Sequence, residues 1–437
     1  MTRPGGTWEN WGRTAKVRPR SVETPATVDA VQRAVQAAGA RGTRLKAVGA
    51  GHSFTGIALA PGVLLDLSDL TGLVEVDTER LRVRLLAGTR LHRIPALLAP
   101  HGLAMPNLGD IDRQSISGAI STGTHGTGAR FGGISTQVVG ATLVTADAAL
   151  LTVDETQNAD LLPAVALGLG ALGILVDVTL QCVPAFVLHA VEHPEPLDDV
   201  LANMLSRAAQ ADHFEFYWFP HTDVALTKTN TRLPESAVRL PLPRVGRWID
   251  EAVLSNGLYR VACGLGAVAP FIVPPFSRLA VRLTGDREYT DVSTRVFTQS
   301  RTVRFREMEY ALPVENVGAA FTEMRALISR RGWKISFPVE VRFAAADDLW
   351  LSTAHGRATA YIAVHRYWRE NPTEYFEAVE RIMLAHDGRP HWGKMHTLDA
   401  EALRTRYPRF DDFVALRDRL DPSRMFANHY LERVLGR

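Results

Sequence analysis

The chain has 437 residues, of which 46% are apolar and 22% are charged, which is the composition of a folded globular protein rather than a disordered one. Its 49 basic residues are balanced by 47 acidic ones, so the net charge of +2 gives no support for nucleic-acid binding. The only two cysteines, Cys182 and Cys263, exclude a disulfide framework and a cysteine-built zinc site, and they favour a reducing cytoplasm.

Targeting and membrane signals are weak. The first six residues have no apolar core, so no signal peptide is expected. The uncharged apolar run at 261–273 is shorter than the roughly 20 residues that a membrane span needs, and Pro270 interrupts it. We interpret this run as a buried or capping segment. A peripheral contact with a membrane surface is the second interpretation.

The first 180 residues are predicted to be α+β with short strands, because apolar residues recur there at both helical and alternating spacing. The expected elements are a helix at 28–38, strands at 44–48, 63–67 and 81–86, a short helix at 91–101, and a hairpin of strands at 138–145 and 150–153.

The pattern changes after residue 185. A proline-rich section at 233–275 is predicted to be loop-like. The other expected elements are helices at 197–209 and 375–386 and strands at 214–219, 304–311, 336–343 and 360–364. At 437 residues the chain has room for two domains of ordinary size.

Two loops of small residues carry the strongest ligand signal. One is Gly49-Ala50-Gly51-His52-Ser53, and the other is residues 121–128, with the sequence STGTHGTG. Glycines let the main chain approach a ligand closely and turn successive N–H groups toward an anion. Two such loops predict that one elongated, phosphate-bearing cofactor is held from both sides.

A nearby G-x-G-x-x-G match, at 168–173, has the glycine spacing of an NAD-binding fingerprint. The dinucleotide fingerprint must follow a strand and open a helix. Here a helical pattern (158–167) comes first and a strand pattern (174–180) follows. The sequence therefore excludes a Rossmann NAD site at this position.

These loops belong to a wider set of motifs that resembles a known family. The segments are VGAGHSF at 48–54, NLGD at 107–110, SGAISTGTHG at 117–126, residues 167–178, PVEVRF at 338–343, HWGK at 391–394, and the ending DP…FAN at 421–428. Together they resemble the FAD-linked sugar-1,4-lactone oxidases and dehydrogenases of the vanillyl-alcohol-oxidase superfamily, and within it the actinobacterial gulonolactone dehydrogenase type. The resemblance covers nearly the whole chain.

The resemblance implies an α+β fold in two parts. Residues 1–184 would form an FAD-binding domain of the vanillyl-alcohol-oxidase (PCMH) type, and residues 185–375 an α/β substrate cap. Residues 376–437 would return to the FAD domain, with the flavin ring at the interface.

The resemblance also implies the cofactor contacts. In several members the histidine of the first loop is joined covalently to the flavin 8α-carbon, and His52 has that position; the alternative is a histidine that only forms hydrogen bonds within its loop. His125 is expected to shape its own loop. The other residues expected around FAD are Gly49, Ala50, Gly51, Ser53, Gly109, Asp110, Ser115, Gly118, Ser121, Thr122, Gly123, Thr124, Gly126, Gly170, Gly173 and Ile174.

The expected reaction is oxidation of an aldono-1,4-lactone at its C2 hydroxyl, with an open-chain alditol as the alternative substrate. Such a reaction needs a hydride acceptor, proton handling and positive charge near the developing alkoxide. Glu340 and Arg342 lie two apart in a strand pattern and so share a face. The resemblance adds Lys394. We expect Glu340 and Lys394 to handle the proton and orient the hydroxyl, and Arg342 to stabilise charge.

Alternatives remain for several of these residues. Glu340 and Arg342 could form a structural cross-strand ion pair, and an arginine neighbour makes a carboxylate a weaker base. His365 is either a further site residue or a core histidine. Asp110 either contacts substrate or caps its turn. His386, His391 and His396 are spaced by five, which is not a metal-ligand pattern, so no metal is expected.

The electron acceptor is left open between oxygen and a one-electron carrier such as a cytochrome. In related enzymes the residue at the position of Gly109 controls access of oxygen to the flavin, and glycine permits it. A flavin- or sugar-binding protein without turnover is the alternative from another class.

Overall fold

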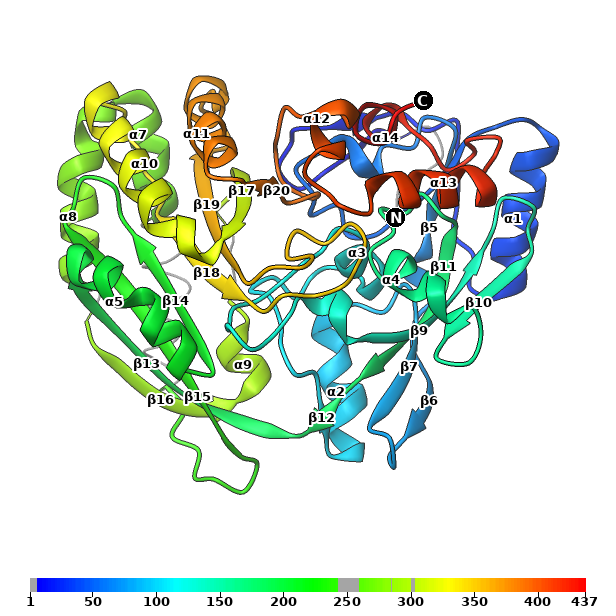
Figure 1. The fold of residues 1–437 in the computed structure, drawn as a ribbon, viewed down its shortest axis with the longest axis horizontal. Coiled ribbons are helices and arrows are strands. Elements are labelled where there is room, and N and C mark those ends of the chain that lie inside the picture. Colours follow the sequence, from blue (N-terminus) through cyan, green and yellow to red (C-terminus); the bar gives the residue numbers. More distant parts are fainter. Residues whose placement is uncertain (1–5, 243–258, 284, 300–302) are drawn as a thin grey trace.

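The computed structural model describes residues 6–242, 259–283, 285–299 and 303–437. Within these ranges the chain forms two parts that lie side by side (Figure 1). Both ends of the chain lie in the first part, which we call the flavin part. The second part is the cap.

Two sheets build the flavin part. A parallel sheet has the order β3-β5-β4, and an antiparallel sheet has the order β10-β9-β11-β7-β6. The strands are β3 (Ser21–Glu23), β4 (Leu45–Val48), β5 (Val63–Asp66), β6 (Leu73–Asp77), β7 (Arg82–Leu86), β9 (Val138–Val144), β10 (Leu150–Asp154) and β11 (Ile174–Gln181). The helices are α1 (Val28–Ala40), α2 (Ile94–Leu98), α3 (Ile116–Ser121) and α4 (Leu162–Val165), and the two-residue strands are β1 (Trp8–Glu9), β2 (Lys16–Val17), β8 (Leu103–Ala104) and β12 (Val183–Pro184).

The cap is one sheet with the order β16-β13-β15-β14-β18-β19-β17-β20. Its strands are β13 (Phe186–Pro196), β14 (His213–Trp218), β15 (Val224–Pro234), β16 (Arg287–Val292), β17 (Phe305–Pro313), β18 (Val339–Ala344), β19 (Thr359–Tyr367) and β20 (Arg389–Pro390). Its helices are α5 (Leu197–Gln210), α7 (Tyr259–Val268), α8 (Val273–Leu283), α9 (Ser293–Phe297), α10 (Val317–Arg331) and α11 (Thr373–Ala385).

The two faces of the cap sheet differ in chemistry because side chains alternate along each strand. Phe216, Val341 and Ile362 belong to the apolar core that α5, α10 and α11 cover. The alternate positions include Glu215, Glu309, Glu340, Arg342 and His365, all of them buried. The sheet therefore presents a charged face on the side away from these helices.

The last part of the chain returns to the flavin part through α12 (Ala400–Arg404), α13 (Phe410–Leu420) and α14 (His429–Leu435). Leu45 of β4 donates its backbone N–H to Met425. Lys46 lies in the same contact, with its ammonium 2.7 Å from the carbonyl oxygen of Gly170 and 3.2 Å from that of Phe426. One buried lysine thus joins β4, the 168–173 loop and the C-terminal segment.

Most expected elements are present. The predicted hairpin is β9–β10, with Leu150 paired to Val144. The order at the G-x-G-x-x-G match is also as expected, since α4 precedes it and β11 follows it. The predicted helix at 91–101 is correct only in part, because 3-10 turns flank the five-residue α2.

The prediction for 233–275 was wrong in its last part. Residues 259–275 belong to α7, a 3-10 turn and the start of α8, while residues 243–258 lie outside the described ranges. The run at 261–273 is not mainly buried either, because Val261, Val268 and Phe271 are exposed. Glycine and proline were given too much weight: Gly266 lets α7 pack closely against Val273, and the prolines begin helical turns, where no N–H is needed.

The predicted domain boundary between residues 375 and 376 falls inside α11. Tyr375, Val379 and Met383 of this helix pack in the apolar core of the cap. We therefore propose that the cap extends through α11.

No helix of the described residues is both long enough and apolar enough to pass through a lipid bilayer.

The contact of Lys46 gives a stability prediction. Lys46→Met leaves the carbonyl groups of Gly170 and Phe426 without their donor, which costs about 1–3 kcal/mol for each buried group. We expect the midpoint of thermal unfolding to fall by several degrees, measured by circular dichroism. Lys16→Met, at an exposed lysine of β2, is the matched control and should leave the midpoint unchanged. Equal midpoints for the two variants would contradict this role of Lys46.

Candidate functional site

A cleft that begins between the two parts of the molecule continues into the flavin part. It consists of a wide cavity of about 600 Å³ and a narrow one of about 100 Å³. The two share His52, Ser53, Gln114 and Thr122 in their walls. An elongated ligand can therefore lie in both at once, as the two glycine loops predict.

The narrow cavity lies within the flavin part and is shaped by residues without bulky side chains. A Cβ at Gly49 would come within 2.5 Å of the hydroxyl of Ser115, and a Cβ at Gly118 within 3.0 Å of the same oxygen. The first loop and the start of α3 thus approach one another as closely as glycine allows. Of the residues expected around FAD, twelve line this cavity: Gly49, Ala50, Gly51, His52, Ser53, Ser115, Gly118, Ser121, Thr122, Gly170, Gly173 and Ile174.

The wide cavity lies between the flavin part and the charged face of the cap sheet. Gly109, Asp110, Thr124 and His125 line it from the flavin part, and Glu340, Arg342 and Lys394 from the other side. Gly123 and Gly126 line neither of the two cavities. A Cβ at Gly126 would lie 2.2 Å from the carbonyl oxygen of Leu108, so this glycine is needed for packing between loops.

Arg342 is the centre of the charged face. Its guanidinium pairs with Glu340 on the same strand, with Glu215 on β14 at 2.8 Å, and with Asp110 of the flavin part. Burial alone would lower the pKa of Arg342, but the three carboxylates hold it well above its usual value. Glu340 and Arg342 therefore form the ion-pair group that was one of the two alternatives, and both also line the cavity. Asp110 lines the same cavity and joins the flavin part to the cap through Arg342.

Lys394 forms an ion pair with a different buried carboxylate, that of Glu307. Its ammonium pairs with Glu307 of β17, and His365 lies 3.5 Å from the same carboxyl group. Burial would raise the pKa of Glu307, but Lys394 and His365 lower it to about 2. Lys394 therefore stands beside a permanent negative charge. His365 does not line the cavity, and its other ring nitrogen lies 3.0 Å from the carbonyl oxygen of Pro338, so it is a core histidine.

His125 links the second glycine loop to the cap. Its Nδ1 lies 2.9 Å from the carbonyl oxygen of Gly126, and its Nε2 lies 3.3 Å from the carboxylate of Glu309. The same ring stacks on Tyr361 at 3.6 Å between centroids. His125 therefore contacts its own loop through Gly126 and the cap through Glu309 and Tyr361.

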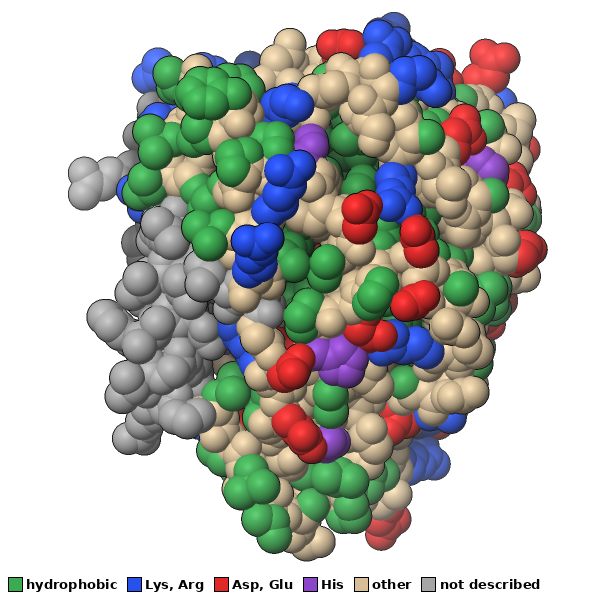
Figure 2. All heavy atoms as spheres, turned by 90° about the vertical axis from the view of Figure 1, so that its left-hand side faces the viewer, with side chains coloured by type: hydrophobic (Ala, Val, Ile, Leu, Met, Phe, Trp, Pro, Cys, Tyr) green, Lys and Arg blue, Asp and Glu red, His purple; other side chains and the backbone are tan. Residues whose placement is uncertain are grey.

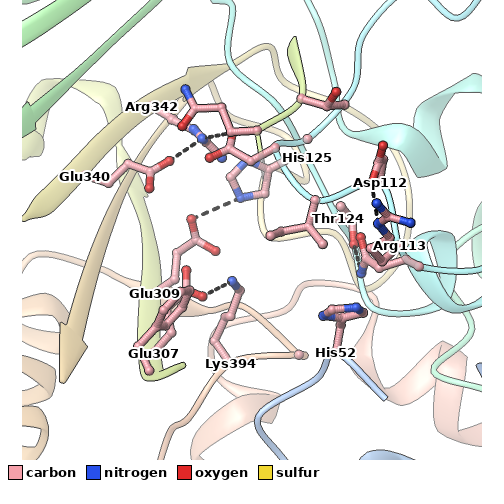
Figure 3. Close-up of a pocket in the computed structure, with 18 of the residues that line it drawn as sticks. His52, Asp112, Arg113, Thr124, His125, Glu307, Glu309, Glu340, Arg342 and Lys394 are labelled. Atoms are coloured by element: carbon pink, nitrogen blue, oxygen red, sulfur yellow. Dashed lines mark hydrogen bonds and ion pairs between the residues drawn. The ribbon is translucent and has the colours of Figure 1, made fainter. Parts of the chain in front are cut away.

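His52 lies across the cavity from Glu340 and Arg342, and Lys394 lies beside it (Figure 3). Burial lowers the pKa of His52 to about 4, and the positive charges of Arg90, Lys394 and Arg113 add to this effect. The imidazole is therefore neutral at physiological pH. A neutral imidazole is a nucleophile, which is the form that covalent attachment needs.

The sequence reading missed Glu215, Glu307, Glu309 and His391, all of which are buried and of which Glu307, Glu309 and His391 line the cavity. A signal for two of them was present. Glu307 and Glu309 stand two apart in the predicted strand FREMEYALP, as Glu340 and Arg342 do in their own strand. A carboxylate is seldom buried without a partner, so paired acidic residues in a core strand indicate a site.

Among the residues that the structure describes, two clusters bring possible metal-ligand atoms within 4.8 Å of one another: His125 with Glu309 and His391, and Asp110 with Glu215 and Glu340. Their atoms already serve other partners. His391, for example, lies 3.1 Å from the carbonyl oxygen of Gly123 through Nε2 and accepts from the N–H of Gly393 at Nδ1. Burial lowers the pKa of His391 to about 4, so it is a neutral hydrogen-bonding residue.

Comparison with known proteins agrees with this architecture. Residues 19–154 match the family model described as FAD binding domain, and residues 178–434 match the model described as D-arabinono-1,4-lactone oxidase. The chain is 42% identical to L-gulono-1,4-lactone dehydrogenase of Mycobacterium tuberculosis over 98% of this chain and 99% of that protein. It is 34% identical to L-gulonolactone oxidase of Scyliorhinus torazame over 98% of each chain.

A likeness in fold reaches further. The crystal structure of cholesterol oxidase from Brevibacterium sterolicum superposes with a TM-score of 0.82 at 19% identity, over 98% of this chain and 96% of that one. The expected two-part α+β fold of the vanillyl-alcohol-oxidase type is confirmed, and FAD is the cofactor that fits the glycine-lined cleft. The chain is a flavin-dependent oxidoreductase and belongs to the D-arabinono-1,4-lactone oxidase family.

Proposed function

We propose that this chain oxidises an aldono-1,4-lactone, such as L-gulono- or D-arabinono-1,4-lactone, at its C2 hydroxyl. The observation that carries the proposal is that Glu340, Arg342 and Lys394 line one cavity with His52, the first two across from His52 and Lys394 beside it (Figure 3). A lactone is small, neutral and rich in hydroxyl groups, so buried ionic hydrogen-bond partners suit it.

FAD supplies the acceptor for the hydride that leaves the substrate carbon, at flavin N5. The protein must then place the hydroxyl group, take up its proton and exclude water. The buried carboxylate of Glu340 is the group that we assign to the hydroxyl proton. Arg342 holds this carboxylate in place while sharing its charge with Glu215 and Asp110.

Lys394 takes a narrower role than the sequence suggested. Its ammonium pairs with Glu307, so we assign it to donating hydrogen bonds and stabilising negative charge rather than to accepting a proton. The same pairing fixes the position of the ammonium at the wall of the cavity. We propose that Lys394 orients the substrate oxygen and stabilises the developing alkoxide.

The alternative substrate is an open-chain alditol, which offers the same hydroxyl groups to the same residues. A protein that binds flavin or sugar without turnover is less well supported, because a mere binding site does not need three ion-paired groups beside the flavin cleft. The electron acceptor that we propose is oxygen or a one-electron carrier such as a cytochrome. We propose a cytoplasmic location, because the two buried cysteines are free. A peripheral contact with a membrane surface is part of the same proposal.

A substrate panel tests the proposal directly. Anaerobic mixing with L-gulono-1,4-lactone or D-arabinono-1,4-lactone is expected to bleach the flavin absorbance, and xylitol is expected to do so much more slowly. Reoxidation by air or by ferricytochrome c then identifies the acceptor. Bleaching by xylitol alone would replace the lactone by the alditol, and no bleaching by any of them would favour a binding protein.

Glu340→Gln keeps the shape of the side chain and removes the proton acceptor. We expect kcat/KM for the lactone to fall by about 100-fold or more, since a positioned general base contributes on that order. The flavin content should stay unchanged, because Glu340 does not line the narrow cavity. Glu288→Gln, at an exposed carboxylate on β16, is the control and should keep full activity. An active Glu340→Gln enzyme would remove Glu340 from the mechanism.

His52 is tested by flavin retention. We propose that neutral His52 is joined to the flavin 8α-carbon, so acid-precipitated wild-type protein should stay yellow and His52→Ala should release its flavin. Because the pKa of His52 is about 4, attachment to added FAD should not change between about pH 6 and pH 8. His101→Ala, at an exposed histidine, should behave as wild type. Complete release from the wild type would show that His52 only forms hydrogen bonds.

A further inference from the structure

The helices α7 and α8 form a hairpin on the cap with an unusual outer surface. Val261, Leu265 and Val268 are 57%, 56% and 86% exposed, and their spacing of four and three places them on one face of α7. Phe271, in the turn between the helices, is 76% exposed. An apolar stripe of this kind on a folded protein marks a contact surface.

The inner side of the same hairpin packs closely against the cap, so the hairpin is a well-attached part of the fold. Cys263 and Gly266 of α7 are buried. A Cβ at Gly266 would come within 2.9 Å of Val273, which shows how closely the two helices approach. Tyr259 donates a hydrogen bond to the backbone of Ser336 at 2.8 Å and packs edge-on against Phe337. The hairpin is therefore held firmly on the cap while its stripe faces outward.

The charged residues of the hairpin are all positive. Arg260, Arg278 and Arg282 are the only charged residues between positions 259 and 283, and all three are exposed. Burial lowers the pKa of His221, and the nearby positive charges of Lys334 and Arg278 lower it further. Figure 2 shows this side of the molecule, with hydrophobic side chains gathered beside a row of basic ones.

We propose that the α7–α8 hairpin docks the protein on an anionic lipid surface, with the stripe of Val261, Leu265, Val268 and Phe271 in the interface and the arginines on the headgroups. Helices that lie in a membrane surface combine an apolar face with arginine or lysine beside it. The proposal deepens the peripheral contact given under the proposed function, and it does not depend on lactone turnover.

A second copy of the chain suits this surface less well. In a two-fold dimer the same patch meets itself, so Arg278 and Arg282 would lie near the same arginines of the partner. Like charges at such an interface repel, whereas an anionic bilayer attracts them. The absence of carboxylates from the hairpin thus favours lipid over a copy of this chain.

Vesicle sedimentation of the full-length holoenzyme tests the proposal. We expect binding to vesicles of phosphatidylcholine with phosphatidylglycerol, and much weaker binding to phosphatidylcholine alone. Arg278→Ala and Arg282→Ala should each weaken binding to the anionic vesicles by about fivefold, and added salt should reduce the difference. The double variant Val268→Asp with Phe271→Asp should abolish binding.

The matched control is Val74→Asp with Leu150→Asp, which changes two exposed apolar residues of the flavin part. It should bind vesicles as the wild type does. Flavin bleaching by lactone in solution, measured on every variant, should be unchanged, so a failure of the proposed reaction and a failure of docking are read separately. Absence of vesicle binding, equal binding by both double variants, or a dimer in solution that Val268→Asp with Phe271→Asp disperses would overturn the proposal.

Discussion

One buried arginine determines how the two parts of this enzyme meet. Arg342 lies on the central strands of the cap, yet one of its three carboxylate partners, Asp110, comes from the flavin part. Removing one member of a buried ion pair leaves a charge without compensation, which costs about 3–5 kcal/mol. The cap sheet therefore keeps its charged face buried only while the flavin part is in place. His125 and Glu309 add a second pair across the same interface.

The ion pairs also assign the chemistry. Two cations that line the cavity have buried carboxylate partners: Glu307 for Lys394, and Glu340, Asp110 and Glu215 for Arg342. Groups held in this way donate hydrogen bonds and stabilise negative charge, but they do not exchange protons readily. Glu340 lies on the charged face and lines the cavity. Its partner Arg342 also pairs with Asp110 and Glu215. For this reason the proton is assigned to Glu340 rather than to Lys394.

The sequence allowed the flavin part to be predicted well, because its signals are local. Glycines in short loops, the hairpin at 138–154 and the order of elements around 168–173 all depend on neighbouring residues. The partners on the cap face were harder to predict. Glu215, Glu307 and Arg342 come from strands far apart in the chain, and only the strand order of the sheet brings them together. The error at 261–273 has a different cause: apolar content was taken to mean burial, but Val261, Val268 and Phe271 lie on the surface.

Two different explanations apply to the glycine at position 109. Glycine at this position was interpreted as an opening for oxygen toward the flavin. In the structure a Cβ here would lie 2.9 Å from the carbonyl oxygen of His125 and 3.2 Å from the methyl group of Thr124. The loop carrying Asp110 must pack against the loop carrying His125 for both interface ion pairs to form. Packing alone thus requires glycine at position 109, so this glycine is not by itself an argument for oxygen over a one-electron carrier.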